Sequence, residues 1–212
     1  MRVEEVLQRI GSGGAGVSAV QNTDDLGAAR EATSHLVSLG HRRIAHISYA
    51  PLSYLAADAR FHGSCQALKE ARIAFNKRLL AIGNFSSDSG FDAMNEILRN
   101  RAIPTALFAS NDTVAVGAMA AIRAAGFSVP KDIAVVGFDD LPFAAFTNPA
   151  LTTVRSQPKA LGEHAARAAL TLLEGKRVGI RRSIIPLELI VRESCGAAKS
   201  ADQDLRSAIK IR

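Results

Sequence analysis

Residues 133–140 read IAVVGFDD, a continuous apolar run that ends in two carboxylates. An uninterrupted run of this kind is typical of a strand that is buried on both faces, as in a parallel sheet covered by helices. The Asp139 carboxylate comes where such a strand would end, and a charge there is costly to hold unless another group pairs with it. The stretch predicts a central parallel strand with a candidate ligand contact at its carboxyl end.

Outward from this strand, short β-branched runs alternate with longer amphipathic segments from residue 17 onward. The alternation predicts repeated βαβ units and therefore an α/β fold, a parallel sheet flanked by helices. We expect strands at 17–20, 43–48, 79–82, 105–109, 133–138, 153–155 and 183–191, and helices at 28–39, 56–71, from 86–88 onward, 113–125 and 158–174. Gly63, Ala67 and Ala71 would let the second helix lie close against the sheet.

Composition sets broad limits on the molecule. The 212 residues, 48% of them hydrophobic, suffice for one large domain or two small lobes. The net charge is +6, but the 26 basic residues are spread along the chain, and even the cluster at 176–182 suits a solvated surface better than a phosphate site. Without a signal peptide or an apolar membrane span, a soluble cytoplasmic protein with no membrane partner is expected.

The glycine-rich segment and the two cysteines do not indicate a cofactor or metal site. Gly11, Gly13 and Gly16 have the spacing of a dinucleotide-binding loop, but they precede the predicted strand at 17–20 instead of following a strand, which favours a flexible turn. Cys65 and Cys195 are far apart and have no companions at metal-ligand spacing. Neither a cofactor, a metal site nor a disulfide is expected.

Polar side chains follow most of the predicted strands, at the points where the loops of a parallel sheet converge on one edge. In chain order they are Asp24, Asp25, Ser53, Tyr54, Arg60, Asn84, Phe85, Asn111, Asp112, Asp139 and Asp140. Carboxylates and amides bind hydroxyl groups, and an aromatic ring covers the apolar face of a sugar. Because the set contains no obvious nucleophile and base, it favours a binding protein over an enzyme.

Several of these residues also suit structural roles. Asp24 and Asp112 fit a helix N-cap as well as a ligand contact. Phe85 suits the core somewhat better than a stacking surface, and Arg60 suits a structural salt bridge as well as a ligand contact. The five histidines are expected to pack or cap and not to act as bases or metal ligands.

Six spaced motifs, in the same order, resemble the effector-binding domain of the LacI family, which includes the lactose and purine repressors. They are HLVSLGHRRIAHI, ADARFHGSCQAL, ASNDTVAVGAMAAIRAAG, VPKDIAVVGFDD, PALTTVR and PLELIVRESC. The resemblance runs from about residue 17 to 195. It implies a type I periplasmic-binding-protein-like fold, in which an effector binds in a cleft between two α/β lobes joined by crossover strands.

The resemblance also implies ligand-binding residues. Arg60, Phe85, Asn111 and Asp139 fall on positions that contact the effector in characterised relatives, and Asp24 is retained as a further candidate. Tyr54 stands where the purine repressor has a ligand-binding arginine, and Ser156 replaces a glutamine that touches ligand in some members. These two departures favour a sugar-like effector over a purine, and both residues are kept as candidate contacts.

The resemblance implies one complete lobe and part of a second. Residues 1–22 would be a remnant of the first lobe and a flexible N-terminus, 23–154 the C-terminal effector lobe, 155–187 part of the N-terminal lobe, 188–195 a return strand of the C-terminal lobe, and 196–212 a tail. The helix-turn-helix head and most of the first lobe are expected to be missing. Operator DNA would then be reached only through that missing head.

The sequence thus predicts the effector-sensing domain of a DNA-binding transcriptional regulator. Ligand-induced lobe movement would control operator binding in the full-length protein, and a homodimer is expected. A sugar-binding protein of a transport system shares the fold and is the alternative. The pairing of TTVR with VVGFDD favours the regulator.

Overall fold

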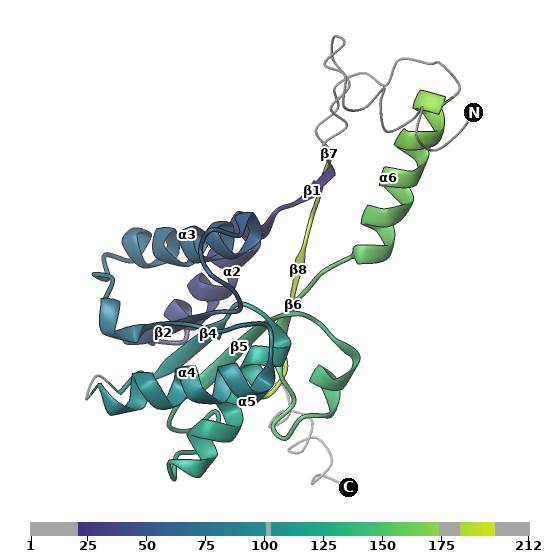
Figure 1. The fold of residues 1–212 in the computed structure, drawn as a ribbon. Coiled ribbons are helices and arrows are strands. Elements are labelled where there is room, and N and C mark those ends of the chain that lie inside the picture. The colour runs from purple at the N-terminus through teal and green to yellow at the C-terminus, as the bar shows by residue number, and fades with distance from the viewer. Residues whose placement is uncertain (1–20, 101–102, 174–182, 198–212) are drawn as a thin grey trace, which may run out of the picture. The chain divides into compact units, whose positions relative to one another are not determined.

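The structure is a computed structural model that describes residues 21–100, 103–173 and 183–197 (Figure 1). The chain divides into two compact units. Unit 1 comprises the described residues of 1–24 and 157–187, and unit 2 comprises those of 25–156 and 188–212. Each unit is described by itself. The strand expected at 17–20 and the basic cluster at 176–182 lie outside the described residues.

Unit 2 is built on a six-stranded sheet with the order β3-β2-β4-β5-β6-β8. Its first five strands are parallel, and β8 runs antiparallel to β6. The strands are β2 (Ile44–Ser48), β3 (Leu80–Ile82), β4 (Ala106–Ala109), β5 (Ala134–Asp139), β6 (Thr152–Arg155) and β8 (Glu188–Ile190). The predicted α/β fold with a parallel sheet is confirmed.

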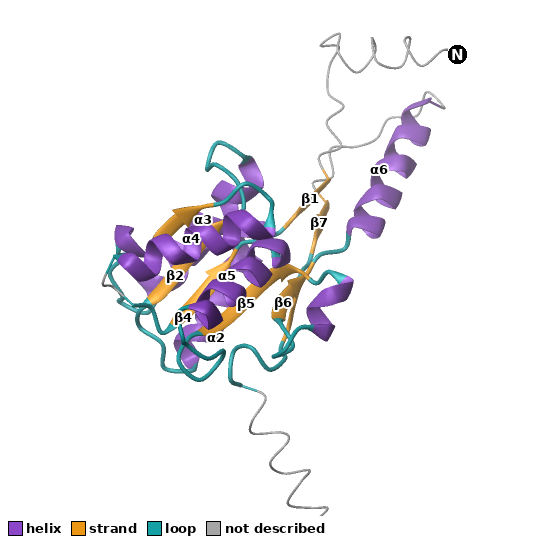
Figure 2. Ribbon diagram, turned by 60° about the horizontal axis from the view of Figure 1, so that its bottom comes forward, coloured by secondary structure: helices purple, strands orange, loops and turns teal. Residues whose placement is uncertain are grey.

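Helices cover both faces of this sheet (Figures 1 and 2). They are α2 (Asp25–Ser38), α3 (Leu55–Glu70), α4 (Ser87–Arg99) and α5 (Asp112–Ala124), with short 3-10 helices η1 (Lys77–Leu79) and η2 (Pro142–Phe146). Side chains at Ile47, Leu107 and Val135 enter a core cluster with α4 and α5. His46, which precedes Ile47 in β2, points to the opposite face of the sheet and packs against Phe61 of α3. Alternation along the strands therefore explains why β2 and β4 are buried throughout.

Two pairs of helices, α2 with α3 and α4 with α5, approach closely at a glycine. A Cβ on Gly63 of α3 would meet the Leu26 carbonyl of α2, and a Cβ on Gly117 of α5 would meet the Ser87 carbonyl of α4. The expectation that Gly63 lets α3 lie close against the sheet was therefore wrong. The absence of a side chain there admits the neighbouring helix instead.

Unit 1, as far as it is described, contains strands β1 (Gln21–Thr23) and β7 (Ser183–Ile185), which pair in parallel, and helix α6 (Pro158–Leu173). The strand expected at 183–191 is in fact two strands, β7 and β8, which belong to different units. Pro186 separates them and lacks the N–H that a continuous ladder needs. No helix in the described ranges is both long and apolar enough to cross a membrane.

His46 is an unusual member of the core. The side chain is 2% exposed and lies edge-on to Phe61 and Phe108, at centroid distances of 5.4 and 5.3 Å. Neither ring nitrogen has a hydrogen-bond partner among the described residues. Burial lowers the pKa of His46 to about 3, so the imidazole stays neutral in the folded protein across the physiological range.

His46 should make the protein less stable in mild acid. Below pH 6.5 the unfolded chain takes up a proton that the folded chain cannot accept, so the free energy of unfolding falls as the pH drops toward 3. Between pH 7 and pH 5 this contribution amounts to about 2 kcal/mol. We expect His46→Leu to remove it, as measured by urea unfolding at both pH values.

The same substitution at His62, whose side chain is 60% exposed, is the control and should leave the pH dependence nearly unchanged. An equal pH dependence in wild type and His46→Leu would contradict the assignment.

Candidate functional site

The carboxyl ends of β2, β4, β5 and β6 gather most of the polar residues selected from the sequence. Parallel strands end at one edge of a sheet, so the segments that follow them converge there. Arg60 reaches this edge from the second turn of α3. We name this edge, with Tyr49, Arg60, Asn111, Asp139 and Ser156, the carboxyl-edge site.

Arg60 is the centre of the carboxyl-edge site, although it is only 9% exposed. Its Nε donates to Asp25 Oδ1 at 2.7 Å, and its Nη1 donates to the Ser110 carbonyl at 2.7 Å. Nη1 also lies 3.5 Å from Asp139 Oδ1. The guanidinium sits 3.6 Å from the centroid of the Phe138 ring, a cation–π contact that favours a desolvated arginine. The salt bridge considered from the sequence is present.

Asp139 is the last residue of β5, and its φ angle of 111° is one that residues other than glycine rarely adopt. Its side chain is 26% exposed beside Arg60. Burial raises the pKa of Asp139 to about 6, and the neighbouring Asp25 adds to the increase while Arg60 opposes it. A partly exposed carboxylate held in this way can accept hydrogen bonds from a ligand.

The N-cap role considered for Asp112 belongs to its neighbour. Asn111, and not Asp112, is the N-cap of α5, because its Oδ1 accepts from the Val114 amide at 2.8 Å. This cap leaves the Asn111 Nδ2 group to donate elsewhere.

Asp112 is fully buried and accepts from Thr153 Oγ1 at 2.5 Å and from the Leu141 amide at 2.8 Å. Burial raises the pKa of Asp112 to about 7. A Cβ on Gly137 would collide with this carboxylate, so the glycine makes room for a structural acid under the site.

An aromatic group borders the polar residues. Phe85 is 49% exposed and Tyr54 is 52% exposed, so the core position considered for Phe85 is wrong. The Phe85 ring meets the rings of Tyr49 at 5.1 Å and Tyr54 at 5.7 Å. Tyr49, whose ring centroid is 5.1 Å from the Arg60 guanidinium, connects this group to the charged centre.

Tyr49 is a site residue that the sequence analysis does not select, although its position directly after a strand could have indicated it. It follows the last residue of β2 directly, as Asp140 follows β5. Its backbone N–H donates to Ser110 Oγ at 2.7 Å, and this bond ties the ends of β2 and β4 together.

The remaining two candidates differ in their placement. Ser156 belongs to unit 2, and both its amide and its hydroxyl donate to the Asp139 carbonyl, at 3.4 and 3.2 Å. Asp24 falls in unit 1, where its amide donates to the Ile185 carbonyl at 3.4 Å.

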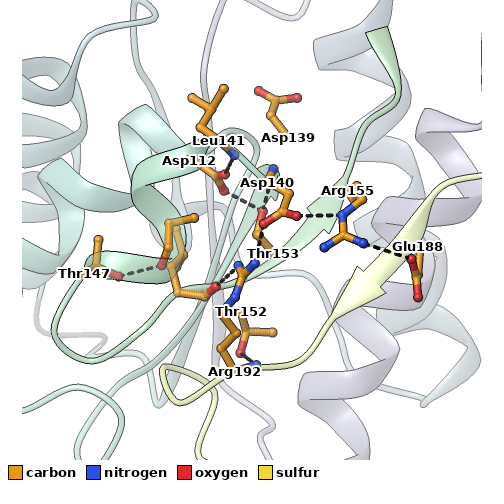
Figure 3. A network of polar contacts seen from close by, with 12 residues as sticks. Asp112, Asp139, Asp140, Leu141, Thr147, Thr152, Thr153, Arg155, Glu188 and Arg192 are labelled. Atoms are coloured by element: carbon orange, nitrogen blue, oxygen red, sulfur yellow. Dashed lines mark hydrogen bonds and ion pairs between the residues drawn. The ribbon is translucent and has the colours of Figure 1, made fainter. Parts of the chain in front are cut away.

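A second charged group surrounds Asp140 (Figure 3). Asp140 Oδ2 accepts from Arg155 Nε at 2.7 Å, and Oδ1 accepts from Arg192 Nη2 at 2.6 Å. Burial opposes the charged form, but the hydrogen bonds and positive charges of Arg192 and Arg155 outweigh it and lower the pKa of Asp140. Sequence reasoning noticed Asp140 but assigned it no partner.

The chemistry of the carboxyl-edge site is that of recognition. It offers carboxylate and carbonyl acceptors, an amide and a guanidinium as donors, and aromatic surfaces, the combination that orients a small polar ligand. Within the described ranges, no group of three or more His, Cys, Asp or Glu residues is arranged to hold a metal ion.

Comparison with known proteins identifies the family. The model of the periplasmic binding protein-like domain matches residues 33–195. The chain belongs to that family. A similar curated protein is the HTH-type transcriptional regulator CelR of Thermobifida fusca, 36% identical over 171 residues, which are 81% of this chain and 50% of the relative.

Solved structures agree with this family. A transcriptional regulator CelR–cellobiose complex superimposes with a TM-score of 0.78 at 35% identity, over 85% of this chain and 56% of that one. A lac repressor dimer bound to operator and an anti-inducer superimposes with a TM-score of 0.76 at 33% identity, over 82% and 51%. The predicted relationship to LacI-family regulators is confirmed, and the chain spans about half the length of the curated relatives it matches.

Arg60→Gln tests how the site of this periplasmic binding protein-like domain is held together. Removing the guanidinium takes the counter-charge from the buried Asp25 and the partly buried Asp139, which should lower the free energy of unfolding by about 3 kcal/mol in urea at pH 7. Part of this loss should be recovered at pH 5, because protonation of Asp139 relieves the repulsion.

Arg30→Gln is the matched control. It breaks an ion pair with Glu70 whose two side chains are 46% and 47% exposed, and such a pair contributes at most about 1 kcal/mol. Equal losses for the two variants would show that Arg60 is not the electrostatic centre of the edge.

Proposed function

We propose that this chain is the effector-sensing region of a LacI-family transcriptional regulator and that it binds a sugar or a related small metabolite at the carboxyl-edge site. The observation that carries the proposal is the convergence of Arg60, Asp139 and Ser156 with the aromatic group at one edge of the sheet. Relatives that are transcriptional regulators support it.

Each contact has a proposed role. Asp139 accepts hydrogen bonds from ligand hydroxyls, because its carboxylate is partly exposed while Arg60 holds it from below. Beside it, the Nδ2 group of Asn111 donates, and the hydroxyl of Ser156, whose proton goes to the Asp139 carbonyl, accepts. Tyr54 and Phe85 cover an apolar face of the ligand. Asp24 remains a candidate contact from unit 1.

A glycoside is the ligand class that this set fits best. Carboxylate and amide groups next to exposed rings suit a molecule with hydroxyls on its edges and apolar C–H faces. The similar CelR structure is a complex with cellobiose, and cellobiose is therefore the first probe for this chain.

In the complete regulator, we propose that ligand binding moves two lobes and so changes operator binding by a homodimer. Such a shift is limited by the difference in ligand affinity between the two conformations. The lac repressor structure is a dimer bound to operator, which supports this arrangement. In this proposal, the effector lobe comprises residues 23–154 and 188–195, and residues 155–187 are part of the other lobe. A separate head would contact DNA. The protein would act in the cytoplasm and would not catalyse a reaction.

Calorimetry with cellobiose and a panel of mono- and disaccharides tests the ligand. We expect saturable binding of at least one glycoside, and a loss of at least about tenfold in affinity for Asp139→Ala, because one desolvated charge-assisted hydrogen bond contributes roughly 1.5–3 kcal/mol.

Asp92→Ala, which removes an exposed acid from the surface of α4, is the control and should bind as wild type does. If Asp139→Ala retained full affinity for a sugar that wild type binds, the ligand site would have to lie elsewhere.

A further inference from the structure

Asp139 and Asp140 form one dipeptide with two electrostatic surroundings. The Asp139 carboxylate lies beside Arg60, whereas Asp140 is paired with Arg155 and Arg192. Both residues have positive φ angles, 111° and 53°. A short backbone segment in such rarely populated conformations is held by its surroundings, so a displacement of one carboxylate is transmitted to the next residue and not absorbed by a loop.

Asp140 is linked to two of the three segments by which the chain passes between the units: it bonds to Arg155 of β6 directly and reaches Glu188 of β8 through that arginine. The chain leaves unit 2 after Ser156 and re-enters it at Glu188. Arg155 is the last residue of β6 and lies opposite Glu188, the first residue of β8. Arg155 Nε is 2.7 Å from Asp140, and its Nη1 is 3.6 Å from Glu188 Oε2. The carboxylate that directly follows β5 is thus linked to the end of β6 and, through Arg155, to the start of β8 (Figure 3).

Arg192, two residues beyond the end of β8, adds further bonds to this arrangement. Its guanidinium donates to Asp140 at 2.6 Å and to the Leu151 carbonyl at 2.8 Å, while its backbone amide donates to Thr152 Oγ1. The Asp140 side chain is 9% exposed, so these charge-assisted bonds are poorly screened by water. We name Asp140, Arg155, Glu188 and Arg192 the connecting-strand cluster.

The candidate ligand contact touches the same segment through its backbone. The Asp139 carbonyl accepts from both the amide and the hydroxyl of Ser156, the last residue before the chain enters unit 1. The side chain of Asp139 therefore faces Arg60, while its carbonyl and the next residue hold the connecting strands.

We propose that Asp140 is a positioning residue that couples the state of the Asp139 carboxylate to the ends of the two connecting strands, β6 and β8. This inference rests on the proposed function for its biological meaning, because lobe movement needs such a coupling. The coupling itself can be measured in the absence of a ligand. Asp139 pairs with Arg155 in the β5–β6 ladder and so touches β6 directly, but it makes no pairing with Glu188–Ile190. In the proposal, the charged and bonded Asp140 carries a change at Asp139 to that strand.

A double-mutant cycle read by hydrogen exchange tests this coupling in the 212-residue chain without any sugar. NMR would follow the backbone amides of Thr153–Arg155 and Glu188–Ile190, with those of β4 as an internal reference for global stability. We expect Asp139→Asn to accelerate exchange at Glu188–Ile190 at least about threefold in the wild-type background, and to have almost no further effect in an Asp140→Asn background.

Additive effects of the two substitutions, or an unchanged rate at Glu188–Ile190 in Asp139→Asn, would overturn the proposal. Equal acceleration in β4 and in the connecting strands would also overturn it, because that result indicates general destabilisation. Asp92→Asn removes one exposed carboxylate and serves as the control.

If Asp140→Asn does not fold, Arg155→Gln replaces it in the cycle, since that side chain is 46% exposed and only one arm of the cluster is lost. The cycle contains no ligand, so a failure to bind cellobiose leaves its result intact, and an additive cycle leaves the sugar-binding proposal intact.

Discussion

A positive charge at Arg60 is shielded from water, and the carboxyl edge of the sheet is organised around it. Asp25 from the start of α2, Asp139 from the end of β5 and the Ser110 carbonyl after β4 all converge on this guanidinium. Because a buried charge without partners is strongly destabilising, these three elements are held in register by one side chain. The Phe138 ring beneath it completes the enclosure.

This constraint explains why the edge suits recognition. The acids around Arg60 are fixed before a ligand arrives, so little ordering is needed on binding. Asp139 stays partly exposed while Asp25 is buried, so a ligand can reach the first carboxylate, whereas the second holds Arg60 from within the protein. The rings of Tyr54 and Phe85 add an apolar surface next to this charge.

Much of this arrangement could be predicted from the sequence. Continuous apolar runs such as 133–138 indicated parallel strands, and the polar residues that follow them indicated the edge, because both depend only on local order along the chain. Tertiary contacts were harder to foresee. Asn111 and Asp112 both suit an N-cap, and only the hydroxyl of Thr153 and the amide of Leu141 decide which one turns inward. Arg192, far along the chain, gave no sign of its bond to Asp140.

The division between β7 and β8 shows a different limit. The largely apolar stretch from 183 to 191 resembles one strand, and Pro186 is a local signal that it is interrupted. What the sequence does not state is that the two halves pair with different partners, β1 and β6. Pairing between distant segments depends on the assembled sheet and not on the local pattern.

The most direct test of the account is a map of amide chemical-shift changes on titration with glycosides, beginning with cellobiose. We expect saturable changes centred on Tyr49, Phe85, Asn111 and Asp139, with no comparable change at the opposite edge, where β2 and β4 begin. Saturable changes confined to that opposite edge, or none with any sugar of the panel, would contradict the claim that Arg60 organises a ligand site.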